Sequence, residues 1–104
     1  VEELSKRSNL VIGIFGHAGD GNMHPTIVHD HGDTAAAERA QRAFSDIVEI
    51  AQSLGVSARG EHGIGSIKAG FVANEISATV IELQRAVKKV FDPNSILNPG
   101  KKIP

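Results

Sequence analysis

The sequence predicts an α+β fold in which a β-hairpin, part of a larger antiparallel sheet, packs against two amphipathic helices. Three observations predict this class. Two short, β-branched segments flank the turn-forming dipeptide Asp20–Gly21. Two later segments repeat apolar residues at helical spacing. The 104 residues, 40% of them hydrophobic, can bury the core of one modest domain.

The hairpin is predicted over residues 9–17 and 23–29. The first segment, NLVIGIFGH, has the continuous apolar character of a buried strand, and MHPTIVH is its expected partner. Asp20–Gly21 predicts a two-residue type I′ turn, which requires positive φ at both central positions. In that register His17 is directly opposite His24.

Two helices follow the hairpin. The first is expected over residues 34–54, with Asp33 as its N-cap and Gly55 just past its end. The second is expected over residues 77–91 and stops at Asp92, because a proline disfavours helix in the residue before it. The predicted buried seam of this second helix is Ile76, Val80, Leu83, Val87 and Val90.

Three other segments are expected to be irregular or extended. Residues 1–8 form a polar lead into the first strand, residues 56–65 form a short strand and a glycine-rich loop, and the tail 94–104 is extended. The start at Val1 indicates a piece of a longer protein.

Composition excludes several classes of function. The formal net charge is −1 and no dense basic cluster exists, which argues against nucleic acid as a partner. No apolar run is long enough for a transmembrane helix, and no signal-peptide pattern is visible. The lack of cysteine excludes disulfides and thiolate metal sites.

The two histidines of the predicted hairpin can bind one metal ion. Opposed residues in a hairpin have Cβ atoms about 5 Å apart and share a face, so His17 and His24 could each place a ring nitrogen at roughly 2.1 Å from one ion. Glu61, in the stretch GEHGIG, is the best candidate for a third ligand. Two histidines and one carboxylate leave open positions, as catalytic sites do. The alternative is an exposed and inert histidine pair.

Three motifs together resemble the C-terminal region of FAD-linked oxidases of the vanillyl-alcohol-oxidase superfamily. They are HAGDGNMHP at 17–25, GEHGIG at 60–65 and FDPNSILNPGKKIP at 91–104. Within that superfamily they are most similar to the glycolate oxidase and D-lactate dehydrogenase group. The resemblance covers the chain from about Leu10 to Pro104, with the motifs in the family's order.

The resemblance implies a role for each site residue. His17, His24 and Glu61 would bind a divalent metal (zinc, manganese or iron), His62 would be the general base, and Asn98 would lie near the isoalloxazine ring. The implied reaction is oxidation of a small 2-hydroxy acid, glycolate or D-lactate, to the 2-oxo acid, with hydride transfer to FAD. Position 26 holds threonine, where some relatives have an asparagine that touches substrate. This difference argues against a 2-hydroxyglutarate-type substrate.

The resemblance also implies where the chain belongs. Residues 1–104 would form the C-terminal part of the substrate, or cap, domain, while FAD would be bound mainly by an N-terminal domain absent from this sequence. This segment alone is therefore expected to be inactive. An iron–sulfur partner subunit is implied, with a location in the cytoplasm or peripheral at the inner membrane. Two other classes stay open at this point: a metal-dependent hydrolase and a non-catalytic metal-binding module.

Overall fold

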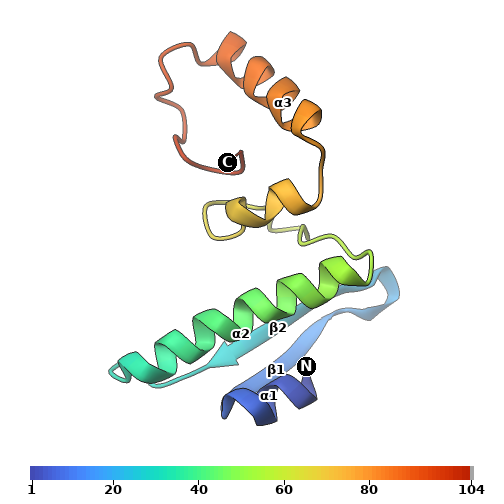
Figure 1. The fold of residues 1–104 in the computed structure, drawn as a ribbon, viewed down its shortest axis with the longest axis vertical. Coiled ribbons are helices and arrows are strands. Elements are labelled where there is room, and N and C mark those ends of the chain that lie inside the picture. The colour runs from blue at the N-terminus through green and yellow to red at the C-terminus, as the bar shows by residue number, and fades with distance from the viewer. Residues whose placement is uncertain (104) are drawn as a thin grey trace. The chain divides into compact units, whose positions relative to one another are not determined.

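The computed structural model describes residues 1–103 and confirms the α+β class. The chain divides into two compact units, residues 1–50 and residues 51 onward. The elements, in chain order, are α1 (Glu2–Ser8), β1 (Val11–His17), the 3₁₀ helix η1 (Ala18–Asp20), β2 (Asn22–Val28), α2 (Thr34–Ser53), the 3₁₀ helix η2 (Ala69–Asn74) and α3 (Ala78–Phe91), as Figure 1 shows.

In the first unit, helices α1 and α2 pack on one face of the two-stranded antiparallel sheet (Figure 1). The hairpin contributes Ile12 and Ile27, which are opposite each other in the register, to the core beneath the helices. The other face is open, and Val11 and Phe15 are mainly exposed there. The prediction that the first strand is buried was therefore wrong, because within the described residues helices cover only one face. The core cluster consists of Leu4, Leu10, Ala36, Ala40 and Ala43, with Ile12, Ile27 and Ile47 packed against it.

Helix α1 occupies the segment that the sequence predicted as a polar lead. Acidic residues in its first turn and basic residues in its last turn complement the helix dipole, and Lys6 pairs with Glu2 at 3.0 Å. The helix ends at Asn9, which adopts the left-handed conformation with φ 52°. Only Leu4 is buried, so this short helix has no apolar periodicity that could have predicted it.

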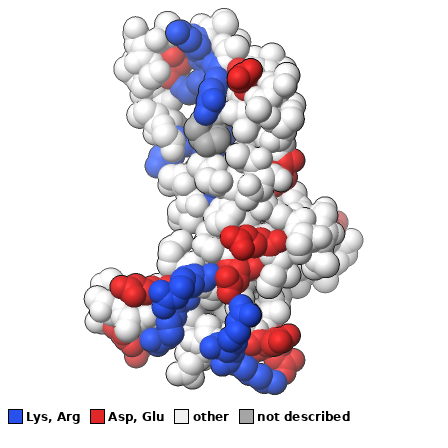
Figure 2. Space-filling model, in the orientation of Figure 1, with Lys and Arg blue, Asp and Glu red and all other residues white. Residues whose placement is uncertain are grey.

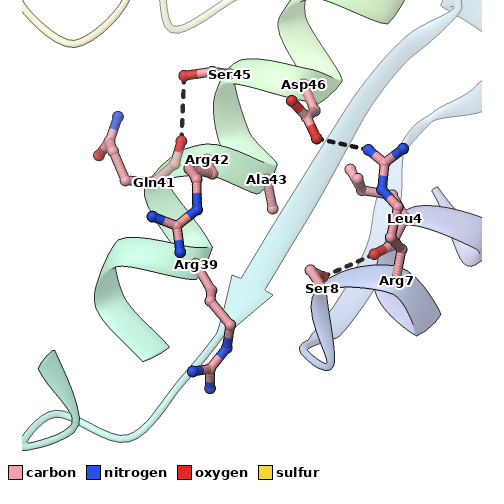
Figure 3. A pocket seen from close by; sticks show the side chains of 9 residues that line it. All are labelled: Leu4, Arg7, Ser8, Arg39, Gln41, Arg42, Ala43, Ser45 and Asp46. Carbon is pink, nitrogen blue, oxygen red and sulfur yellow. Dashed lines mark hydrogen bonds and ion pairs between the residues drawn. The ribbon is translucent and has the colours of Figure 1, made fainter. Parts of the chain in front are cut away.

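The contact between α1 and α2 combines an apolar and an ionic component, both visible in Figure 3. Leu4 and Ala43 are buried in the same core cluster. Beside them, Arg7 Nη2 on α1 donates to Asp46 Oδ2 on α2 at 2.7 Å. An open hollow of about 440 Å³ lies between the two helices next to this ion pair. Because both partners are substantially exposed, the ion pair adds little to stability beyond fixing the approach of the helices.

Both ends of α2 form as the sequence predicted. Asp33 Oδ1 accepts a hydrogen bond from Ala36 N at 2.9 Å, which is an N-cap. At the other end, Gly55 has φ 74°, and the N–H of Val56 bonds back to the carbonyl of Ala51 at 2.9 Å. The N–H of Gly55 bonds to Gln52 O at 3.0 Å, which completes a Schellman motif.

In the second unit, Ile64, Val72 and Ile81 form the core, with Ala69, Ile76 and Ile103 packed against them. Helix α3 begins after Ser77, whose hydroxyl caps Val80 N at 3.4 Å. No strand forms within residues 56–65, so the short strand predicted there is absent. This stretch has no ladder partner, and the backbone groups of Ala58 bond to the side chains of Glu75 and Lys68.

The predicted buried seam of α3 is largely exposed. Ile81 is the only buried residue of α3, whereas Leu83 is 63% and Val90 is 77% exposed, and Val80 and Val87 are also exposed. Ile76 alone among the seam residues packs on the core of the second unit. Ile81 is not a member of the predicted seam, because a helical pattern of apolar residues does not say which of them the unit itself covers.

The surface carries charges of both signs, and acidic and basic side chains are interspersed over α1 and α2 in Figure 2. None of the helices in residues 1–103 combines the length and the apolar character that crossing a membrane requires.

The N-cap of α2 provides a test of this fold. We expect Asp33→Ala to lower the free energy of unfolding by about 1 kcal/mol, because the amide of Ala36 loses its acceptor. Urea unfolding followed by circular dichroism measures the change. Asp30→Ala, in the same exposed loop, is the control and should leave the midpoint unchanged. Equal midpoints for Asp33→Ala and the wild type would contradict the cap.

Candidate metal centre and catalytic loop

The turn of the hairpin differs from the predicted one. Ala18–Asp20 forms a 3₁₀ turn, and only Gly21, with φ 68°, takes positive φ. The connection therefore has four residues instead of two, and the register shifts by two. His17 is opposite Asn22, and His24 is opposite Phe15, so the two histidines do not face each other directly as predicted.

The two imidazoles nevertheless lie side by side. A shift of two residues keeps every side chain on its face, because the period of a strand is two. The ring centroids of His17 and His24 are 5.7 Å apart at an interplanar angle of 85°. The ring of Phe15 lies 6.0 Å from that of His24 on the other side of the pair. Neither histidine is buried, so the pair is accessible from the open face of the hairpin.

The second predicted group lies in the glycine-rich loop of the second unit. His62 Nε2 is 3.3 Å from Glu61 Oε1, a contact that becomes an ion pair when the ring is protonated. The His62 side chain is 78% exposed, so it can reach a ligand. The loop turns at Gly63 and Gly65, with φ of 71° and 60°, conformations that favour glycine.

A half-buried carboxylate anchors the segment that leads into this loop. Glu75 Oε1 accepts from the hydroxyl of Ser57 at 2.6 Å and from Nε of Arg59 at 2.9 Å. Its other oxygen accepts from the backbone N–H of Ala58 at 3.0 Å. These hydrogen bonds lower the pKa of Glu75, and the bond from Ser57 has the largest effect. Burial of the carboxylate acts in the opposite direction. Glu75 thereby supplies the hydrogen-bond acceptor that the Ala58 amide would find in a helix or a sheet.

Two lysines complete the anchoring of the loop. Lys68 Nζ donates to the carbonyl of Ala58 at 2.9 Å. After the loop, the backbone N–H of Lys102 donates to the carbonyl of Gly65 at 2.6 Å. Glu61 and His62 therefore lie between two fixed points.

The third predicted group, Asn98, lies in a turn organised by Asp92. Asp92 is 4% exposed, and its carboxylate accepts from the N–H of Ile96 at 2.9 Å and of Leu97 at 3.0 Å. Lys88 Nζ bonds both to Asp92 Oδ2 and, at 2.7 Å, to the Leu97 carbonyl. The hydrogen bond from Lys88, together with those from the two amides, lowers the pKa of Asp92 below its ordinary value of 3.8, against the effect of burial.

Asn98 follows this turn in the left-handed conformation, with φ 46°. It lines an open hollow of about 400 Å³. Basic side chains dominate the charged lining, which comprises Arg85, Lys88, Lys89, Lys101 and Asp92. An amide that can both donate and accept hydrogen bonds, in a basic hollow, suits a polar or anionic ligand.

The structure thus pairs His17 with His24 in the first unit and Glu61 with His62 in the second. Asn98 has a separate place in the C-terminal turn. Sequence reasoning missed the two supporting carboxylates, Glu75 and Asp92. Asp92 carried a signal, since an aspartate before proline at a helix end often bonds to the amides that follow. Glu75 carried none, because its partners are 16 to 18 residues away.

A comparison with protein families identifies the family of this chain. The model described as "FAD linked oxidases, C-terminal domain" matches residues 1–102. This match covers nearly the whole chain, including both histidine motifs and the turn around Asn98.

Curated relatives agree with this family. The glycolate oxidase subunit GlcD of Bacillus subtilis is 41% identical over 101 residues, which are 97% of this chain and 22% of that protein. GlcD of Escherichia coli K12 is 39% identical over the whole chain and 21% of its own length. The mitochondrial D-lactate dehydrogenase [cytochrome] of Arabidopsis thaliana is 36% identical over 93% of this chain and 17% of its own length. The chain therefore spans about a fifth of the length of these relatives.

The lowered pKa of Asp92 makes a pH-dependent prediction. A carboxylate whose pKa is lower in the folded than in the unfolded state stabilises the fold above the unfolded value, and this contribution is lost as the pH falls through the folded value. We therefore expect Asp92→Asn to lower the unfolding free energy at pH 7. The difference from wild type should shrink as the pH falls below about 3.8.

Urea unfolding at pH 7, 5, 4 and 3 measures this difference. Glu82→Gln, at an exposed position of the preceding helix α3, is the control and should show no such pH dependence. A difference between Asp92→Asn and wild type that stays constant down to pH 3 would show that the charge of Asp92 does not stabilise the turn.

Proposed function

Because the chain belongs to the family of the C-terminal domains of FAD-linked oxidases, we propose that it is the C-terminal part of the substrate domain of a flavin-dependent 2-hydroxy acid oxidoreductase. The names of its relatives, glycolate oxidase subunit and D-lactate dehydrogenase, support glycolate or D-lactate as substrate. The family match also favours this function over a metal-dependent hydrolase or a non-catalytic metal-binding module. The observation that carries the proposal is the match over residues 1–102.

The proposed metal ligands are His17, His24 and Glu61. The support within the first unit is geometric, because two imidazoles on one exposed face with ring centroids 5.7 Å apart can direct a nitrogen each toward a common ion. Glu61 is proposed as the third ligand from its place in the GEHGIG motif. A set of two imidazoles and one carboxylate suits zinc, manganese or iron.

His62 is the proposed general base. Its exposed ring, next to Glu61, can accept the hydroxyl proton of a 2-hydroxy acid. When bound, the metal would polarise the substrate hydroxyl, and FAD would accept the hydride. His62 holds the proton, and the metal ligands fix where the hydroxy acid lies.

Asn98 is the proposed contact of this chain with the flavin ring. Its amide can accept or donate a hydrogen bond, and Asp92 and Lys88 hold the turn that positions it. The rest of the FAD site is proposed to lie in the part of the relatives that this chain does not cover. An iron–sulfur partner subunit belongs to the same proposal, which the word subunit in the names of two relatives supports.

The ligand assignment predicts selective loss of metal. In the intact protein, we expect His17→Ala, His24→Ala and Glu61→Gln each to lower metal content, with activity partly restored by added Zn²⁺ or Mn²⁺. Metal analysis after dialysis, together with activity toward glycolate and D-lactate, measures both effects. His31→Ala, an exposed loop histidine outside the proposed site, is the control. Wild-type metal content in Glu61→Gln would remove Glu61 from the set.

The proton-transfer role of His62 predicts a different defect. His62→Ala should retain metal and flavin but slow flavin reduction by about 10²–10⁴-fold, the usual contribution of a general base. Stopped-flow measurement of flavin reduction at saturating substrate isolates this step. If His62→Ala loses the metal while Glu61→Gln keeps it, the roles of these two neighbours are reversed.

A further inference from the structure

Gly16, directly before His17, has a conformation and a surrounding that no other residue would tolerate. Its φ is +148°, in the region that glycine adopts and other residues avoid. A Cβ built on Gly16 would lie 2.3 Å from the carbonyl oxygen of Asn22 and 3.0 Å from Cα of Met23. It would also lie 3.1 Å from Cδ2 of the His24 ring.

The backbone atoms that such a Cβ would displace belong to the two residues that precede His24, a proposed metal ligand. Asn22 O and Met23 Cα belong to the backbone of β2, so they cannot turn aside as the end of a flexible side chain could. They lie in the two residues before His24. A shift of this backbone therefore moves the His24 imidazole. The added Cβ would also press directly on the ring, because it would lie 3.1 Å from His24 Cδ2.

The histidine pair has little tolerance for such a shift. His17 and His24 are diagonal neighbours in the register, which lie about 7–8 Å apart in a regular ladder, with their Cβ atoms somewhat closer. Their ring centroids are 5.7 Å apart. Two nitrogens that bind one ion at about 2.1 Å require this proximity to be kept.

We propose that Gly16 is a positioning residue of the metal centre. The space left by its missing side chain lets β2 and the His24 ring approach β1, and this approach places the His24 imidazole beside that of His17. The inference rests on the proposed metal site and adds a determinant of its geometry that is not itself a ligand.

The same strand offers a matched control. Gly13 lies in β1 three residues earlier, and a Cβ built there meets nothing within 4 Å. Gly13→Ala therefore introduces the same methyl group and the same change in chain entropy into the same hairpin. It differs from Gly16→Ala in having open space around the added group and in lacking a φ that favours glycine.

The test is a Co²⁺ titration of the metal-free intact protein, followed by the visible absorption of the bound ion. Gly16→Ala should bind Co²⁺ about 10–100-fold more weakly than wild type, the range found for residues that orient metal ligands. It should also change the absorption spectrum, because the His24 nitrogen moves. Gly13→Ala should bind Co²⁺ as wild type does, with the same spectrum.

The outcomes separate the two levels of the proposal. Equal Co²⁺ affinity and spectra for wild type and Gly16→Ala overturn the role of Gly16 and leave the metal site standing. A wild type that binds no Co²⁺ overturns the metal site itself, and the inference with it. Equal weakening in Gly13→Ala and Gly16→Ala also overturns the inference, since any methyl group in β1 would then act alike.

A measurement on the wild type holds even when Gly16→Ala fails to fold. In the metal-free intact protein, selective labelling of histidine and glycine should reveal a nuclear Overhauser effect between Gly16 Hα and His24 Hδ2. A second effect should connect the rings of His17 and His24. Absence of the Gly16–His24 effect in folded protein overturns the proposal.

Discussion

The contact between Gly16 and the backbone of β2 is the constraint on which the arrangement of the hairpin depends. The strands approach so closely there that a side chain at Gly16 would collide with Asn22 O at 2.3 Å. This approach occurs next to the irregular end of the ladder, where η1 replaces a tight turn. Main-chain geometry at Gly16 therefore helps to position the diagonal pair of histidines.

In the second unit, the segments that carry Glu61, His62 and Asn98 are held by buried or partly buried carboxylates. No strand forms within residues 56–65, and a carboxylate supplies the acceptor for the amide of Ala58. Glu75 binds the segment before the GEHGIG loop, and Asp92 binds the turn before Asn98. Glu75 combines one backbone amide with Arg59, and Asp92 combines two backbone amides with Lys88. Charge-assisted bonds of this kind are stronger than neutral ones.

Local signals predicted the parts of the fold that depend on neighbouring residues. Asp33 and Gly55 predicted the two ends of α2, because caps act within one helical turn. The shared face of His17 and His24 also held, although the predicted register was wrong by two residues. Strand periodicity determines the face, whereas the conformation of Asp20 determines the register.

Features that depend on distant residues could not be predicted in this way. The exposure of Leu83 and Val90 depends on what covers α3, and an apolar pattern does not contain that information. The partners of Glu75 lie far along the chain. The close approach at Gly16 is a matter of tertiary geometry, since nothing in the sequence distinguishes Gly16 from the open position at Gly13.

The anchoring of the loop that carries Glu61 and His62 has a consequence for how it would meet a ligand. Ala58 is held by Glu75 and Lys68, and Gly65 is held by the Lys102 amide. A segment fixed at both ends explores few conformations, so most of its chain entropy is already lost on folding. Ordering it around a bound molecule then costs little further entropy, and more of the contact energy is available as affinity.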